Sequence, residues 1–147
     1  MVDLVAANKE ARLRLAIENF YFGYRAFTAP PDRILAQRGL GRVHHRILYF
    51  VGRNPRISVN ALLALLLVSK QALNAPLRQL VEMRLVTMAT AEHDRRVREL
   101  TLTESGAKLE GQLTGTQMKQ LQEVFDQVGQ DAEFGWMRVM HALGKQG

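Results

Sequence analysis

Apolar residues recur at helical spacing near the start of the chain. Five of them follow one another at intervals of four, three, four and three positions: Leu13, Ile17, Phe20, Tyr24 and Phe27. This spacing places side chains along one face of an α-helix, and it predicts a helix over residues 3–27. Pro30 and Pro31 are expected to end this helix because proline has no backbone N–H and clashes with the preceding turn.

A run of eight apolar residues, ALLALLLV, occupies residues 61–68. It is too short to cross a bilayer, which takes about 20 apolar residues. No longer apolar stretch and no basic-then-apolar leader is present in the sequence. We therefore expect a soluble protein with no membrane partner.

The serines on either side of this run indicate its structure. Ser58 precedes the run and Ser69 follows it, and serine is a favoured N-cap residue of helices. Eleven positions separate the two serines. That distance leaves room for a short helix, a tight turn and a second helix, which is the helix-turn-helix layout.

The short helix carries more leucines than one core face needs. Three of them are expected to face the core: Leu62, Leu66 and Leu63. Val68 is expected to fill the turn. Leu65 and Leu67 remain, and either a neighbouring segment or subunit covers them or they line a ligand pocket.

The helical spacing gives way to alternation after residue 85. Apolar and polar side chains alternate over residues 86–90 and again over residues 97–102, as in half-buried strands. The polar, charged stretch AEHDRR lies between them, so the pattern predicts a β-hairpin with a basic tip. A helix-turn-helix followed by a hairpin is a winged helix. Further helices are expected over residues 42–52 and, after a cap at Thr103, over the C-terminal region.

Composition and charge narrow the class of protein. The 147 residues are 47% hydrophobic, enough for one domain over residues 1–147 with a core of its own. The absence of cysteine excludes disulfides and cysteine-ligated metals, and it fits a cytoplasmic protein. A formal net charge of +6 and a pI near 10.2 favour a polyanionic partner.

Polar residues on the helix after Ser69 suit a nucleic acid. Three leucines are expected to anchor this helix in the core: Leu73, Leu77 and Leu80. Lys70, Asn74 and Arg78 are spaced by four on another face, with Gln71 beside them. Amides pair with adenine and arginine pairs with guanine in the major groove, so this face predicts base reading. The alternative is an ordinary solvated helix face.

The hairpin tip adds a second basic element. His93, Arg95, Arg96 and Arg98 lie on or near the turn, where positive charge suits a minor groove or the phosphate backbone. The alternative is a solubilising turn in which Asp94 pairs with an arginine and charge prevents edge pairing.

These segments resemble the MarR (multiple antibiotic resistance regulator) family. The stretch DRRVRELTLTESG is similar to the family's wing signature, carried here by five residues: Asp94, Arg96, Leu102, Thr103 and Gly106. Five more residues match the family's helix-turn-helix: Ser58, Leu62, Leu66, Val68 and Ser69. The resemblance covers about residues 10–143. The chain departs from the family pattern at Arg84, where glycine is usual, at Leu63, where alanine is typical, and at Pro76 inside the reading helix.

The resemblance implies a mainly α fold with a small β-hairpin wing. It implies a bacterial regulator with a helical dimerisation region over residues 1–31 and 103–147 and a DNA-binding winged helix over residues 40–102. A homodimer acting as a repressor on a palindromic operator follows, with half-sites about 34–36 Å apart or a multiple of that. The expected DNA-binding residues are Ser58, Ser69, Lys70, Gln71, Asn74, Arg78, His93, Arg95 and Arg96.

The resemblance also implies a cleft for a small aromatic effector, for which Tyr21, Tyr24, His44 and His45 are candidates. No catalytic or cofactor motif is present, so neither an enzyme nor a cofactor is expected. Adjacent His44 and His45 point about 100° apart on a helix and cannot chelate one metal together. The competing hypothesis is a winged-helix protein-interaction module without DNA binding, whose reading face would be acidic or apolar.

Overall fold

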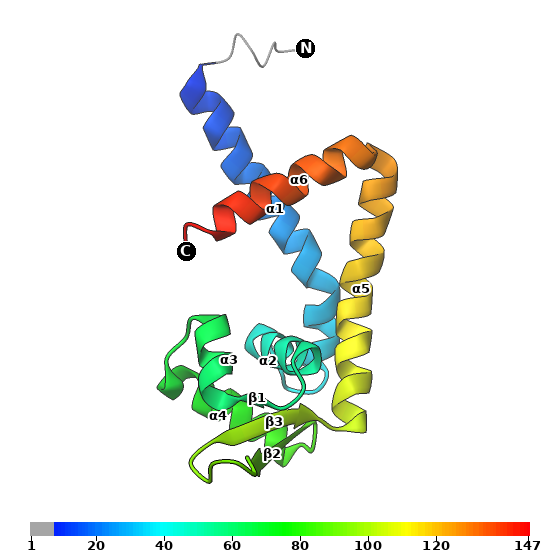
Figure 1. Cartoon of the computed structure of the whole chain (residues 1–147). Coiled ribbons are helices and arrows are strands. Elements are labelled where there is room, and N and C mark those ends of the chain that lie inside the picture. The colour runs from blue at the N-terminus through cyan, green and yellow to red at the C-terminus, as the bar shows by residue number, and fades with distance from the viewer. Residues whose placement is uncertain (1–7) are drawn as a thin grey trace.

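The computed structural model describes residues 8–147, and within them it is mainly helical with a small antiparallel sheet (Figure 1). The elements in chain order are α1 (Lys9–Ala36), α2 (Arg42–Arg53), β1 (Ile57–Ser58), α3 (Val59–Leu66), α4 (Lys70–Glu82), β2 (Val86–Thr90), β3 (Arg98–Leu102), α5 (Glu104–Val128) and α6 (Gln130–Gly144). The predicted fold class, a winged helix-turn-helix joined to N- and C-terminal helices, is confirmed.

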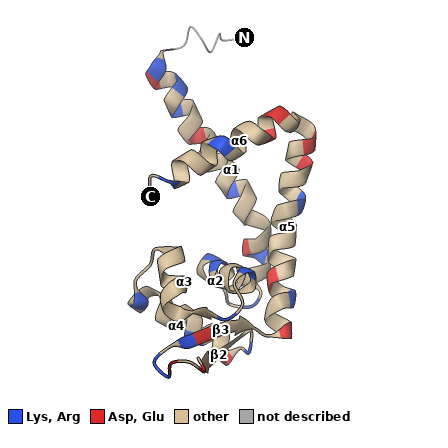
Figure 2. Cartoon of the chain, in the orientation of Figure 1, with Lys and Arg blue, Asp and Glu red and all other residues tan. Residues whose placement is uncertain are grey.

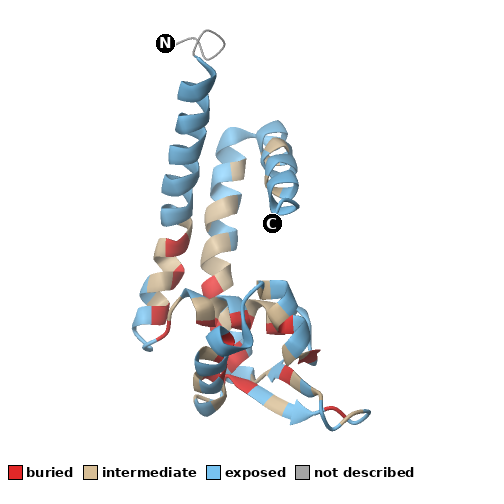
Figure 3. Cartoon of the chain, turned by 90° about the vertical axis from the view of Figure 1, so that its left-hand side faces the viewer, coloured by how far each residue is buried: buried red, intermediate tan, exposed pale blue. Residues whose placement is uncertain are grey.

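The hydrophobic core lies in the winged-helix half of the molecule. The fully buried side chains include Leu35 of α1, Ile47 and Leu48 of α2, and Leu113 of α5. The first half of α1 and most of α6 are exposed instead (Figure 3). The C-terminal end of α1 and the N-terminal part of α5 thus belong to the core of the winged helix. The opposite ends of these two helices project away from it.

The wing is a three-stranded sheet in the order β1–β3–β2. The predicted hairpin is confirmed, with Met88 opposite Leu100 across the β2–β3 pair. The short strand β1 was not predicted: Ile57 pairs with Leu100 on the other edge of β3. Two residues carry no detectable alternation, so β1 exists only because β3 offers it a partner.

The predicted helix caps are confirmed by their hydrogen bonds. Ser58 Oγ accepts from the Ala61 N–H at 3.0 Å, and Ser69 Oγ accepts from the Ala72 N–H at 3.1 Å. Thr103 Oγ1 accepts from the Gly106 N–H at 3.0 Å at the start of α5. The axes of α3 and α4 are bent by 117° relative to each other, and this angle is typical of a helix-turn-helix.

The prediction that Val68 fills the turn is wrong. Leu67 ends α3 in the left-handed conformation at φ 54°, and this directs the chain outward. Val68 is 37% exposed and Leu67 is 78% exposed. Leu62 is buried and Leu63 and Leu66 are partly buried, as the leucine pattern predicts. Leu65 is exposed like Leu67.

The prediction that Pro30 and Pro31 end the first helix is also wrong, because α1 continues to Ala36. Pro31 is fully buried in the core together with Leu35. Proline fits helical φ, and its missing N–H is tolerated where the freed carbonyl finds another donor. The predicted start at residue 3 lies outside the described residues, and Asn8 caps the described part of α1.

The end of α4 shows why position 84 favours glycine. Arg84 adopts φ 60°, and the Leu85 N–H donates to the Leu80 carbonyl at 2.9 Å in a left-handed helix termination. Gly106 packs against this turn so closely that a Cβ would collide with the Leu85 carbonyl. The helix itself is continuous through Pro76.

None of the helices within residues 8–147 is long and apolar enough to span a membrane alone, and α3 and α4 reach that length only as a sharply bent pair.

Candidate functional site

Helix α4 is held against the core by one apolar face. Leu73, Leu77 and Leu80 are 4% exposed or less, so the three predicted anchors are confirmed. Burial of a leucine side chain stabilises a fold by about 1.5–3 kcal/mol, and three in register fix the rotation of the helix. The remaining faces of α4 are consequently presented in fixed directions.

One flank of α4 and the wing enclose a polar groove of about 380 Å³. Its polar lining comes from three elements: Lys70 and Asn74 of α4, Ser58 and Asn60 around the start of α3, and Arg96 and Arg98 of the wing. Asn60 is a lining residue that the sequence reasoning missed, since a lone asparagine in a leucine-rich helix carries no pattern. Cationic and amide groups gathered in one groove can meet phosphates and base edges.

The other flank of α4 is tied to α2 by a histidine. His44 is buried; its Nδ1 accepts from the Gly41 N–H, and its Nε2 lies 2.9 Å from Gln79 Oε1. Since Nδ1 accepts, Nε2 carries the proton and donates to Gln79. His44 thus caps α2 and positions α4, and it does not line the cavity described below.

Among the other predicted DNA-binding residues, Gln71 and Arg78 are exposed on α4 and lie outside the lining of the groove. Ser69 caps the helix. The structure therefore places Lys70 and Asn74 on the wing side of the helix and leaves Arg78 further round it.

The tip of the wing is braced by one ion pair. The Asp94 carboxylate accepts from the Arg96 backbone N–H at 2.9 Å and from the Arg96 guanidinium at 3.1 and 3.2 Å. These bonds lower the pKa of Asp94, and the bonds from the guanidinium have a larger effect than the bond from the backbone N–H. The Arg96 side chain is nevertheless 90% exposed, and His93 and Arg95 are exposed beside it. Blue basic segments mark this loop in Figure 2.

A second cavity, of about 340 Å³, lies where α1, α2 and α5 meet. Tyr24 and His45 line it, whereas the two other effector candidates, Tyr21 and His44, do not. Tyr21 is 57% exposed, about one helical turn before Tyr24 on α1. His44 sits one residue, or about 100°, from His45 and therefore faces α4.

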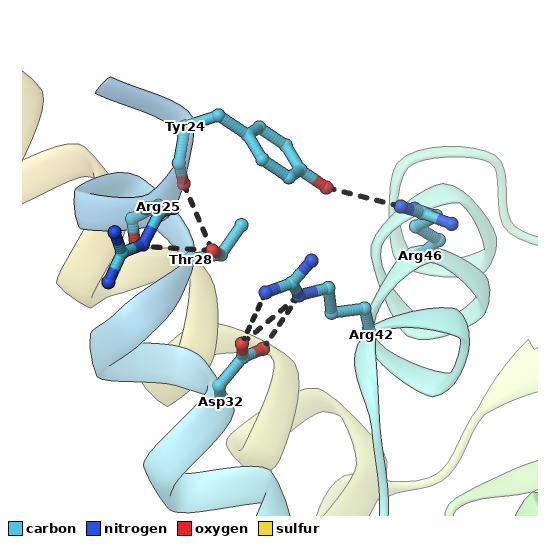
Figure 4. A network of polar contacts seen from close by, with 6 residues as sticks. All are labelled: Tyr24, Arg25, Thr28, Asp32, Arg42 and Arg46. Carbon is cyan, nitrogen blue, oxygen red and sulfur yellow. Dashed lines mark hydrogen bonds and ion pairs between the residues drawn. The ribbon is translucent and has the colours of Figure 1, made fainter. Parts of the chain in front are cut away.

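Polar contacts connect the helices around this cavity (Figure 4). The Arg42 guanidinium donates to the Asp32 carboxylate at 3.0 Å, and Arg46 donates to the Tyr24 hydroxyl at 3.3 Å. These contacts join α1 to α2, while His45 Nε2 lies 3.1 Å from Thr114 Oγ1 of α5. Burial lowers the pKa of His45, and the positive charge of Arg46 lowers it further. The negative charges of Glu110 and Asp32 raise this pKa but do not outweigh burial. Within residues 8–147 no cluster of three potential metal ligands is found.

Comparison with known proteins agrees with this geometry. The model of the MarR family matches residues 38–97. The chain is 41% identical over 134 residues to the HTH-type transcriptional regulator PetP of Rhodobacter capsulatus, covering 91% of this chain and 81% of that protein.

Two solved structures share the fold at low identity. FabT of Streptococcus pneumoniae, in complex with DNA, has a TM-score of 0.81 at 14% identity over 90% of this chain and 95% of its own. A MarR protein of Staphylococcus aureus, in complex with salicylate and kanamycin, has a TM-score of 0.76 at 21% identity over 92% of each chain. By its sequence identity to PetP and by its winged helix, the chain belongs to the MarR family of transcriptional regulators.

Proposed function

We propose that this protein binds double-stranded DNA as a homodimer and represses transcription from a palindromic operator. The observation that carries the proposal is the groove between α4 and the wing, where Lys70, Arg96 and Arg98 meet Asn74. Phosphate contacts give affinity and base contacts give discrimination, and this groove offers groups for both. The structure of FabT with DNA supports the same use of this fold.

The exposed apolar surface of the terminal helices supports a homodimer. On α1, Ile17, Phe20 and Phe22 are at least half exposed, and on α6 Phe134, Met137 and Val139 are exposed to a similar degree. Large apolar side chains exposed in this number on an isolated chain indicate that another chain covers part of these helices. A twofold axis would place the two α4 helices on successive major-groove turns, about 34–36 Å apart or a multiple of that.

We propose that residues 40–102 bind DNA and that residues 1–31 and 103–147 form the dimer. The two regions share part of one hydrophobic core. Leu35, Leu109 and Leu113 pack in the winged-helix core although they belong to α1 and α5. These two long helices would therefore connect the dimer interface to the DNA-binding half. We propose a cytoplasmic location, in keeping with a protein that acts on DNA.

The cavity between α1, α2 and α5 is proposed as the effector site. Its volume of about 340 Å³ suits a small aromatic molecule, and Tyr24, Arg42 and His45 can bind a phenol or carboxylate. The Staphylococcus aureus relative was solved with salicylate. Titration of the protein–operator complex with salicylate and simple phenols should release DNA in the wild type. Unchanged DNA affinity across these compounds at millimolar concentration would rule out this effector class.

Selection of bound duplexes tests the function directly. Fragments that the protein retains from sheared genomic DNA at 150 mM salt are sequenced, and the selected duplex and a scrambled duplex are titrated by fluorescence anisotropy. We expect at least a hundredfold preference for the selected duplex and a twofold-symmetric motif. Equal affinity for the two duplexes would overturn the proposal and favour the interaction-module hypothesis. The cationic lining of the groove gives that alternative no support.

A further inference from the structure

The contacts of α4 determine which of its residues point away from the protein. Leu73, Leu77 and Leu80 face the core. Lys70 and Asn74 line the groove beside the wing, and Gln79 on the opposite flank bonds to His44 of α2. One side of the helix is thereby buried in the core, a second borders the groove beside the wing, and a third contacts α2.

One ridge remains on the fourth side. Successive residues of a helix advance by about 100°, so the side chains opposite the core face are four: Gln71, Ala75, Arg78 and Glu82. All four lie outside the buried core. They succeed one another at intervals of four, three and four residues, so they form a straight line along the outer surface of α4.

Ala75 lies between two hydrogen-bonding side chains on this ridge. With a rise of about 1.5 Å per residue, Gln71 and Arg78 are about 10.5 Å apart along the helix axis. This distance corresponds to about three base-pair steps of 3.4 Å. With α4 lying along the major groove, the alanine methyl group would fall beside the base pairs between those that Gln71 and Arg78 reach.

We infer that Ala75 reads the 5-methyl group of a thymine in each half-site, an inference that rests on the proposed binding of DNA by α4. Thymine is the base that presents an apolar group in the major groove, and an alanine side chain packs against that group without leaving a polar atom unpaired. The short side chain also lets the flanking amide and guanidinium approach the base edges. Ala75 is thus a specificity-determining residue that contributes no charge.

Replacement of thymine by deoxyuridine in the selected duplex tests this assignment, because it removes the methyl group and leaves base pairing intact. Each thymine of the half-site is replaced in turn, symmetrically in both half-sites, and binding is measured by fluorescence anisotropy. At one position we expect the loss to be about fourfold per half-site and about fifteenfold for the dimer, the factor that burial of a methyl-sized group gives.

The variant Ala75→Ser tests whether the loss of affinity caused by deoxyuridine depends on the side chain of Ala75. It adds a hydroxyl to Cβ, so that a polar atom takes the place of the methyl-to-methyl contact, and the uracil penalty at that position should fall below twofold. Ala107→Ser, an exposed alanine in the first turn of α5, is the matched control and should retain the full penalty.

Three results would overturn the inference while leaving DNA binding intact: a half-site without thymine, no uracil penalty at any position, or an equal penalty in the Ala75→Ser variant. A protein that selects no duplex would overturn the proposed function and this inference together.

Discussion

Gln120 of α5 donates a hydrogen bond from Nε2 to the carbonyl oxygen of Ala26 in α1, at 2.9 Å and across 94 residues of sequence. That carbonyl would bond to the N–H of residue 30 in an unbroken helix, and Pro30 has none. The side chain from α5 therefore replaces a backbone donor at the level where α1 passes from its exposed half into the core. Gln120 Oε1 is buried and has no partner among the described residues.

We predict that Gln120→Leu lowers the free energy of unfolding by about 1–2 kcal/mol, because the Ala26 carbonyl is left unsatisfied. The loss of the unpaired Oε1 offsets part of this cost. In a Pro30→Ala background the new N–H can reach the same carbonyl, and Gln120→Leu should then cost less. Denaturant unfolding of the four proteins at one concentration gives the coupling energy. An equal cost in both backgrounds would show that the bond does not compensate for Pro30.

The exposed apolar face of α1 predicts the oligomeric state. Sedimentation equilibrium at micromolar concentration should give about twice 16.6 kDa. Ile17→Lys should shift the protein to a monomer, since Ile17 is 68% exposed in the single chain and would be covered in the dimer. Leu67→Lys is the matched control: Leu67 is exposed at the helix-turn-helix and its replacement should leave the mass unchanged. A monomeric wild type would contradict the dimer and its palindrome.

Arg78 and Arg95 should give different DNA-binding phenotypes. Arg78 is on the outer side of α4, so Arg78→Ala should cost about 1–3 kcal/mol at the selected duplex and relax discrimination at one position per half-site. Arg95 is on the wing, so Arg95→Ala should weaken selected and scrambled DNA alike. It should also reduce the slope of log affinity against log salt by about 1 for each phosphate that the variant no longer neutralises.

Anisotropy titrations at several salt concentrations separate these two phenotypes. Arg96→Ala should show a mixed loss, because Arg96 also holds the wing through Asp94. If neither Arg78→Ala nor Arg95→Ala changes binding, the assignment of α4 and the wing to DNA is incorrect.

Arg84 holds a conformation that favours glycine, with φ 60°. Arg84→Gly should therefore stabilise the protein by about 1 kcal/mol without changing its contacts with the core. Arg84→Ala retains a Cβ and should give no such gain, so the pair isolates the backbone effect. Thermal or denaturant unfolding measures both, and a gain shared by the alanine variant would point to the loss of the arginine charge instead.

His45 should make stability depend on pH. Burial lowers its pKa below the ordinary value of 6.5, so the unfolded chain takes up a proton at a higher pH than the folded chain. The stability that neutral His45 contributes is complete above pH 6.5 and is lost as the pH falls toward its folded pKa. His45→Gln should remove this dependence between pH 7 and 5, while His93→Gln, on the exposed wing, should retain it. Unfolding curves that fall with pH identically in all three proteins would exclude His45 as the cause.

Local patterns in the sequence determined most elements and their core faces. Ser58, Ser69 and Thr103 each bond to an N–H three residues ahead, so their capping role depends on adjacent residues alone. The 3.6-residue period of α4 likewise fixes Leu73, Leu77 and Leu80 on one face, whatever packs there. The sequence of the wing could be matched to a known family because its turn and strand residues form one continuous stretch of the chain.

Only the tertiary structure decided features that depend on distant partners. Helix α1 continues past Pro30 and Pro31 because Gln120 donates a hydrogen bond to the Ala26 carbonyl and because Pro31 is buried in the core. Strand β1 forms because β3 is beside it, and Tyr24 meets His45 in one cavity because α1, α2 and α5 converge. The outward direction of Ala75 follows from the wing on one flank of α4 and His44 on the other. These contacts join residues far apart in the chain, and a pattern read along the sequence carries no information about which distant surfaces meet.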